Sequence, residues 1–317
     1  MVLRTHRDSV PVSIPDNSEI DIQTETKMEG NKMTRTYKTA RKSILTHSQH
    51  DAVWTSQFCS ANDSTAALGM ANGKPLYLDL SKAPHVLIAG CTGAGKSVLM
   101  HDIITSVLFK NSPDTGRLVL IDPKRGAEFG FYRDNPLLWR PVVKNSEQAL
   151  SVLSDLCEEM ERRYEYMDLN RLRNYNGYKI YVFIDELADL MYTSRKQTET
   201  AIVRLAQMGR AAGIHLIIAT QQPVVKVCTG IIKANMPTRI ALHVKTVTDS
   251  RVILDHKGAE LLRGAGDGIL SMADGTEIRF QAGYMTDDEI QAVSNDCGFV
   301  SSQQTAAKQS IWQRIFG

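Results

Sequence analysis

The residues that point most directly to chemistry lie between an apolar run at 85–89 and a helical pattern at 97–109. They match the G-x-x-x-x-G-K-S pattern of a phosphate-binding loop. The glycines at positions 90 and 95 let backbone N–H groups turn toward an anion, and Lys96 can reach the β and γ phosphates. Ser97 can bind Mg2+. The pattern predicts a site for ATP and Mg2+ formed by Gly90, Cys91, Thr92, Gly93, Ala94, Gly95, Lys96, Ser97 and Val98.

Two carboxylates, Asp185 and Glu186, follow a second apolar run at 181–184. In P-loop hydrolases an acidic residue at the end of a strand holds Mg2+, and a second one can polarise the attacking water. We therefore expect Asp185 to bind Mg2+ together with Ser97, and Glu186 to act as the catalytic base. The alternative is an acidic helix N-terminus that the helix dipole stabilises.

Two other residues near these runs are open to more than one interpretation. Gln221 follows a third apolar run at 215–219 and either senses the γ phosphate or makes a simple turn hydrogen bond. Cys91 is either a tolerated variable position of the loop or a thiol whose pKa is lowered at a helix terminus.

The elements that must position these residues alternate between strand and helix. Strand patterns occur at 74–80, 85–89, 117–121, 179–184, 215–219 and 239–243, and helical spacing occurs at 97–109 and 146–168. Continuous apolar strands that alternate with helices predict a mainly parallel sheet covered on both faces. The expected fold is therefore α/β, a RecA-like P-loop NTPase with a central sheet flanked by helices.

Composition limits the remaining possibilities. The 317 residues hold no apolar run long enough for a membrane span, and the first 15 residues lack the apolar region of a secretory signal. Five scattered cysteines without a C-x-x-C pair argue against a disulfide framework or a zinc site, so we expect a cytoplasmic protein. The net charge of +2 is too small to predict a nucleic-acid partner by itself.

The two ends of the chain differ from its middle. Residues 1–50 are polar and are expected to be largely disordered, with a basic stretch at 31–50 that is either a solvated linker or an arm for nucleic-acid phosphates. Residues 51–80 form a lead-in segment with a strand, and residues 81–297 form the main domain. The tail at 298–317 ends in aromatic residues that either pack on the domain or bind a partner.

Several blocks of sequence, in order, resemble the motor domain of the FtsK/SpoIIIE family of DNA translocases, within the HerA-FtsK group. The resemblance covers residues 68–285, and its blocks are PHVLIAG at 84–90, IDPK at 121–124, EMERRY at 159–164, DELADLM at 185–191, RAAGIHL at 210–216, ATQQP at 219–223, TGIIKAN at 229–235 and DSRVILD at 249–255.

The resemblance implies a RecA-like domain that assembles as a hexameric ring around double-stranded DNA and moves along it by ATP hydrolysis. It makes Arg210 the arginine finger supplied to a neighbouring subunit, with a structural salt bridge as the alternative. Lys233 and Arg251 match positions implicated in holding the DNA backbone, although solvated surface charge would also explain them.

Departures from the family pattern limit this transfer. Gln222 stands where the family commonly has Arg, so a phosphate contact loses its charge but keeps a hydrogen-bond donor. Val247 stands where Lys is common, and Lys245, two residues earlier, would face the same way on a strand. We find no transmembrane region and no room after residue 285 for a winged-helix module, so a septum-anchored chromosome pump is not expected.

These observations lead to the hypothesis of a compact ATP-driven translocase of double-stranded DNA, recruited by another protein and carried by a mobile element or a cell. A conjugative coupling ATPase or a viral genome-packaging ATPase is one alternative. A nucleotide-gated scaffold that holds DNA without moving it is an alternative of another class.

Overall fold

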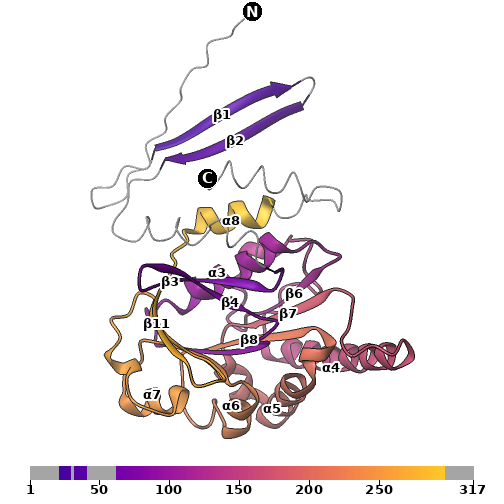
Figure 1. Cartoon of the computed structure of the whole chain (residues 1–317), viewed down its shortest axis with the longest axis vertical. Coiled ribbons are helices and arrows are strands. Elements are labelled where there is room, and N and C mark those ends of the chain that lie inside the picture. The colour runs from indigo at the N-terminus through magenta and orange to yellow at the C-terminus, as the bar shows by residue number, and fades with distance from the viewer. Residues whose placement is uncertain (1–20, 30–31, 41–61, 297–317) are drawn as a thin grey trace, which may run out of the picture.

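The computed structural model describes residues 21–29, 32–40 and 62–296. Residues 62–296 form a sheet of nine strands in the order β4-β3-β11-β10-β9-β5-β8-β7-β6 (Figure 1). The strands are β3 (Thr65–Ala71), β4 (Lys74–Asp79), β5 (His85–Ala89), β6 (Gly116–Ile121), β7 (Lys179–Ile184), β8 (Ile214–Thr220), β9 (Thr238–Leu242), β10 (Asp267–Ser271) and β11 (Glu277–Ala282). The helices are α3 (Lys96–Lys110), α4 (Ser146–Leu169), α5 (Leu187–Ala212), α6 (Gly230–Asn235), α7 (Val247–Leu254) and α8 (Asp287–Asp296), with 3-10 turns η1 (Phe129–Tyr132) and η2 (Ala259–Leu261).

One half of the sheet is parallel, as the alternation of strands and helices predicts. Strands β9, β5, β8, β7 and β6 pair in parallel, and β5 lies between β8 and β9. Every residue of β5 is buried because helices cover both faces of the sheet. The carboxyl ends of β5, β7 and β8 therefore meet at one edge of the sheet, where the predicted catalytic residues follow each strand.

The other half of the sheet is antiparallel and extends it through β10, β11, β3 and β4. Of these four strands, the sequence predicts only β4. Strand β3 is made of small residues and contains a bulge near Gly69, whose left-handed backbone lies so close to Gln281 of β11 that any side chain would collide with it. The α/β class is confirmed, and its sheet is mixed and curled.

Two hydrophobic cores form on the two faces of the sheet. Alternate residues of β5 enter different cores: Leu87 packs on the side of α4 and α5, whereas Val86 packs on the side of α3. Helix α3 is buried along most of its length because β3 and α8 also lie against it (Figure 1). The turn η1 contacts it as well, through Tyr132 and His101. Its first residue, Lys96, is therefore held by a helix that cannot shift without disturbing that core.

The N-terminal range also contains a hairpin. Strands β1 (Asp21–Glu29) and β2 (Lys32–Ala40) pair in antiparallel fashion within the range expected to be largely disordered. Residues 1–20, 30–31, 41–61 and 297–317 lie outside the described residues, so the domain boundaries stay predictions. Across the described parts of the chain, we find no helix with both the length and the apolar character needed to cross a bilayer.

Candidate nucleotide-binding site

The predicted phosphate-binding loop joins the buried strand β5 to the start of α3. The Gly90 N–H donates to the Thr220 carbonyl of β8 at 3.2 Å, and the Cys91 N–H donates to the His243 carbonyl at 2.9 Å. Gly95 has φ of 97° and caps α3, a left-handed conformation that suits glycine. The nine predicted residues thus span the loop and the start of α3, so the positive end of the α3 dipole lies at the loop.

A second segment supports this loop from behind, and sequence reasoning did not identify it. Gly264, Ala265 and Gly266 are all left-handed, with φ of 86°, 48° and 87°. The Gly266 N–H donates to the Ala94 carbonyl at 2.8 Å, and the Ala265 N–H donates to the Gly93 carbonyl at 3.4 Å. We call residues 264–266 the brace, because it fixes the backbone that would bind phosphate.

The brace packs most closely on the loop at Gly266, and ion pairs hold the residue that follows it. A Cβ atom on Gly95 would lie 2.6 Å from the Gly266 nitrogen, so the two glycines meet backbone to backbone. The next residue, Asp267, is buried and pairs with Arg279 at 2.7 Å and with Arg263 at 3.1 Å. The hydrogen bond from Arg279 lowers the pKa of Asp267 to about 2, so the Asp267 carboxylate stays charged at neutral pH.

Lys96 and Asp185 lie together, as the two sequence patterns predict. The Lys96 ammonium donates to the Asp185 carbonyl oxygen at 2.7 Å and to its Oδ1 at 2.5 Å. Both side chains are buried, at 3% and 0% exposure. A buried charge is costly unless it is paired, so each of these two groups offsets the cost of burying the other.

Glu186 lies at the centre of a second set of hydrogen bonds. Its Oε1 accepts the Thr220 hydroxyl at 2.7 Å, and its Oε2 accepts the Gln221 N–H at 3.0 Å. The Gln221 side chain in turn accepts the Thr92 hydroxyl of the loop at 3.0 Å. Glu186 also caps α5 by accepting the Ala188 N–H, so the helix-capping interpretation and the catalytic one describe the same carboxylate.

Lys124 is a site residue that sequence reasoning did not single out. Its ammonium lies 3.5 Å from Asp185 Oδ2 and 4.0 Å from Glu186 Oε2. The available signal was its position after β6, since the carboxyl ends of neighbouring parallel strands share an edge. The two carboxylates therefore face two lysines.

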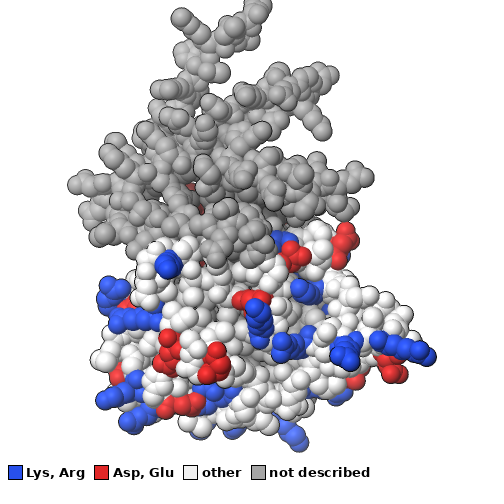
Figure 2. Space-filling view, viewed as in Figure 1, with Lys and Arg blue, Asp and Glu red and all other residues white. Residues whose placement is uncertain are grey.

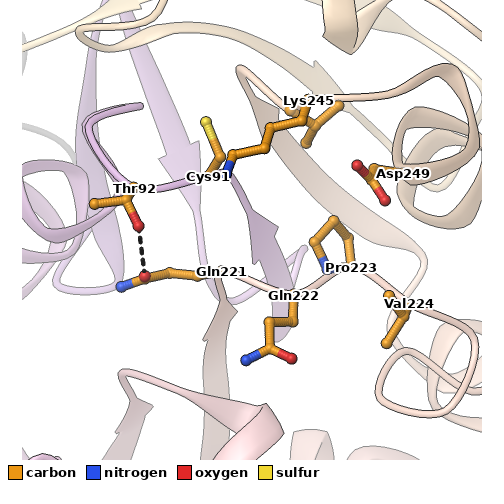
Figure 3. Close-up of a pocket in the computed structure, with 9 residues that line it drawn as sticks. Cys91, Thr92, Gln221, Gln222, Pro223, Val224, Lys245 and Asp249 are labelled. Atoms are coloured by element: carbon orange, nitrogen blue, oxygen red, sulfur yellow. Dashed lines mark hydrogen bonds between the residues drawn. The ribbon is translucent and has the colours of Figure 1, made fainter.

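An open cleft of about 310 Å³ lies beside the loop. Its lining includes Cys91, Thr92, Gln221, Gln222, Lys245 and Asp249 (Figure 3). Figure 3 shows the side chain of Lys245 extending toward Cys91, while Gln222 comes from the opposite wall. The cleft thus connects the phosphate loop with two of the residues expected to contact DNA.

Arg210 lies at the other edge of the sheet. It is exposed in the last turn of α5, just before β8 begins at Ile214. Burial, together with the charge of Arg210, lowers the pKa of His85 to about 4, and His85 is the first residue of β5. Because β8 spans seven residues, roughly 20 Å separate Arg210 from the carboxyl edge of the sheet. Arg210 therefore cannot reach the loop of its own chain.

The residues expected to hold DNA differ in their exposure and in their ion pairs. Arg251 is exposed on α7. Lys233 is only 18% exposed and pairs with Asp255 at 2.6 Å, and the same carboxylate also pairs with Arg239. Val247 begins α7 and Lys245 precedes that helix, so the expectation that the two share a strand is wrong.

The surface charge is mixed on the visible face of the molecule. Figure 2 shows Lys and Arg interspersed with Asp and Glu over the part of that face formed by described residues. This agrees with the net charge of +2, and any DNA contact must depend on local groups.

The donors at the carboxyl edge suit Mg2+. Asp185 Oδ2 is buried and has no hydrogen-bond partner among the residues that the structure describes. A carboxylate oxygen and the Ser97 hydroxyl are hard oxygen ligands of the kind that Mg2+ prefers. Ser97 and Asp185 are thus the residues that would hold the ion.

The fold and this loop define a P-loop ATPase, and comparisons with known proteins specify the family. The chain belongs to the FtsK/SpoIIIE family, whose profile matches residues 51–181 and 177–225. It is 44% identical over 261 residues to the DNA translocase FtsK of Helicobacter pylori J99, and 42% identical over 272 residues to that of Streptococcus pneumoniae R6. These alignments cover 77% and 79% of this chain but only 30% and 35% of the two relatives.

Solved structures agree with the fold. The monomeric form of the pCW3 conjugation coupling protein TcpA with ATPγS is similar, with a TM-score of 0.69 and 26% identity, covering 88% of this chain and 81% of that one. The cytoplasmic domain of the type VII secretion ATPase EccC from Thermomonospora curvata has the same TM-score at 21% identity and covers 83% of this chain and 35% of that one.

Proposed function

We propose that the chain hydrolyses ATP and uses the energy to move double-stranded DNA through a ring of its own copies in the cytoplasm. The observation that carries the proposal is the chain of hydrogen bonds from Thr92 through Gln221 to Glu186. It links the phosphate loop to the expected catalytic base. The family and its DNA translocase relatives support the choice of DNA as the substrate that is moved.

In the proposed reaction, each residue of the chain has a separate task. The loop N–H groups and Lys96 bind and orient the β and γ phosphates of ATP. Mg2+, held by Ser97 and Asp185, would offset the negative charge of those phosphates. Glu186 takes a proton from the attacking water at its carboxylate, and the Thr220 and Gln221 hydrogen bonds hold that carboxylate in place.

Gln221 gives the site a means of sensing the nucleotide. It accepts the Thr92 hydroxyl in the loop, and its backbone N–H binds Glu186. A γ phosphate in the loop would compete for the Thr92 hydroxyl and for the Gln221 amide. Loss of that phosphate would then alter the loop that carries Gln222 on the wall of the cleft.

The position of Arg210 supports a ring. An exposed guanidinium at the amino edge of the sheet can act as an arginine finger only in the site of a neighbouring copy. A hexamer is the assembly that the family resemblance implies. Recruitment by another protein is a further part of the proposal.

DNA would contact the group of residues around the cleft and α7. Arg251 is exposed and has no ion pair among the described residues, so its charge could contact the DNA backbone. Lys233 already pairs with Asp255. Lys245 and Gln222 line the cleft beside the loop, so contacts there could report DNA to the nucleotide site. Such contacts to phosphates provide affinity without reading sequence.

The test compares ATP turnover of the wild type and Lys96→Ala, each with and without duplex DNA. We expect turnover that rises with DNA and is abolished in Lys96→Ala, because that variant loses its main phosphate contact. Turnover that ignores DNA would contradict the translocase proposal while leaving the ATPase intact.

A conjugative coupling ATPase is the second candidate, and the likeness to TcpA over most of both chains favours it. A packaging ATPase would differ in its docking partner. Comparing stimulation by single-stranded and duplex DNA, and identifying a relaxase or capsid protein that copurifies, separates these roles.

A static, nucleotide-gated scaffold is the candidate from another class. We expect the chain to displace the third strand of a triplex during ATP turnover, since movement along the duplex does mechanical work. Binding of duplex DNA without displacement would favour the scaffold.

A further inference from the structure

Lys124 is held in place by the turn that follows β6. The carboxylate of Asp122 is fully buried and accepts three backbone N–H groups, from Lys124 at 3.2 Å, Glu128 at 2.7 Å and Phe129 at 3.1 Å. Arg125 has a left-handed backbone, with φ of 64°. The turn is therefore built to one shape, and it directs Lys124 to the carboxyl edge of the sheet.

At that edge Lys124 faces the half of the Asp185 carboxylate that Lys96 does not contact. Lys96 binds Oδ1, whereas the Lys124 ammonium lies 3.5 Å from Oδ2. Oδ2 is buried and finds no hydrogen-bond partner within the described ranges, and Glu186 Oε2 lies 4.0 Å from the same ammonium. Lys124 is itself 37% exposed, so the contact can be broken from the solvent side.

The ion pairs at this edge would change when nucleotide binds. In the proposed reaction Lys96 binds the phosphates, which would draw it from Asp185 and remove one of the two cations that face the carboxylates. Among the residues that the structure describes, Lys124 is then the remaining cation within 4.0 Å of Asp185 and Glu186. Two buried carboxylates without a counter-charge would repel each other, and this repulsion would lower the stability of the folded chain.

We propose that Lys124 is a positioning residue, a built-in counter-ion that holds Asp185 and Glu186 in place and competes with Mg2+ for Asp185 Oδ2. The inference rests on the proposed role of Asp185 as a Mg2+ ligand but does not depend on DNA or on movement. With Mg2+ bound, Lys124 would give up its contact with Oδ2. Without the ion, Lys124 pairs with Oδ2 and holds the two carboxylates in place.

The first experiment uses nucleotide-free protein and measures the midpoint of thermal unfolding with and without millimolar Mg2+. The variants are Lys124→Met, Lys124→Arg and the control Lys144→Met. Lys144 is an exposed lysine outside this turn, and its side chain lies against Gly126, which belongs to the turn. We expect Lys124→Met to unfold several degrees earlier than the wild type without Mg2+, and Mg2+ to restore much of this loss.

The other variants define what the result means. Lys124→Arg keeps the cation and should respond to Mg2+ as the wild type does, and Lys144→Met should not differ from it. In the double variant Lys124→Met with Asp185→Asn, Mg2+ should restore nothing. If Lys124→Met is as stable as the wild type, or if Mg2+ fails to restore it, the proposal is wrong.

A second measurement remains informative even if Lys124→Met is too unstable for the first. The Mg2+ concentration that gives half-maximal binding of a fluorescent, non-hydrolysable ATP analogue should fall about fivefold in Lys124→Met, because a competing cation has been removed. An unchanged Mg2+ requirement would overturn the competition. Analogue binding without any Mg2+ dependence in the wild type would instead contradict the proposed Mg2+ site.

Discussion

The two edges of the parallel sheet differ in whether their charges are already paired within the chain. At the carboxyl edge, Lys96 and Lys124 both face the Asp185 carboxylate, and Glu186 is held by hydrogen bonds. At the amino edge, Arg210 is exposed and no ion pair is found for it among the described residues. The charges of the carboxyl edge are thus paired within the chain, whereas Arg210 keeps an exposed charge, as its proposed role in a neighbouring copy requires.

The largest expected effect comes from Arg210→Ala. We expect ATP turnover of the assembled protein to fall by about 10³-fold, because an arginine finger stabilises charge in the transition state. Binding of ATP by the isolated chain should not change. Turnover and nucleotide affinity are both measured, with Arg204→Ala as the control because Arg204 lies on the same helix and pairs with Glu161.

A mixture of variants makes this test sharper. Arg210→Ala chains keep an intact loop, whereas Lys96→Ala chains keep an intact arginine. If the arginine acts on a neighbour, mixing the two inactive proteins should restore part of the turnover. No recovery in rings shown to contain both chains would count against the finger, and Arg210 would then be a structural residue.

An intermediate effect is expected from Gly266→Ala, which tests whether the brace stabilises the phosphate-binding loop. A Cβ atom there would lie 2.9 Å from Gln281 Nε2 on a backbone with φ of 87°. We expect a loss of about 3 kcal/mol of unfolding free energy from the left-handed backbone and the crowding. Nucleotide affinity should fall with it, since the brace bonds to the loop.

The matched control for the brace is Gly275→Ala. Gly275 has nearly the same φ, 84°, but nothing lies within 4 Å of its added Cβ. It should cost only about 1 kcal/mol and leave nucleotide affinity unchanged. Equal effects from the two variants, measured by denaturant unfolding and analogue binding, would show that the contact with the loop contributes nothing.

The smallest effect is expected from Arg251→Ala, which removes the exposed positive charge on α7. We expect duplex binding to weaken similarly for all sequences, and the slope of log affinity against log salt to fall by about 1. Lys233→Ala should change the slope less, because Asp255 already neutralises Lys233. A salt titration of duplex binding by both variants checks this, and identical slopes for both would remove the distinction.

The carboxyl edge was largely predictable because each of its residues follows an apolar strand. Lys96, Asp185, Glu186 and Gln221 come together as the parallel order of the strands requires. Buried carboxylates such as Asp185 and Glu186 need hydrogen-bond or charge partners. In a parallel sheet those partners come from the ends of the neighbouring strands, so the contacts at this edge could be predicted in outline.

The brace, Lys124 and the antiparallel strand β3 were not predictable from local patterns. Strand β3 is built mostly from small residues and lacks the apolar run that reveals β5. Strand β11 alternates polar and apolar residues, a signal of a half-buried strand that sequence reasoning missed. The brace depends on the contact between Gly95 and Gly266, which lie about 170 positions apart in the chain. The glycines mark both segments as turns, but no local pattern shows that these two turns contact each other. Lys124 lies in a polar turn, where a lysine is usually solvated, so its contact with Asp185 could not be predicted from the sequence.

The meeting of Gly95 and Gly266 has a genetic consequence. A deleterious change at a packed pair is often suppressed by a smaller residue at its partner, but neither glycine has a side chain left to remove. A Cβ added to Gly95 would meet the Gly266 backbone itself. Selections for revertants of a Gly95 variant should therefore yield true reversion or changes that move the whole 264–266 segment, and never a compensating substitution at Gly266.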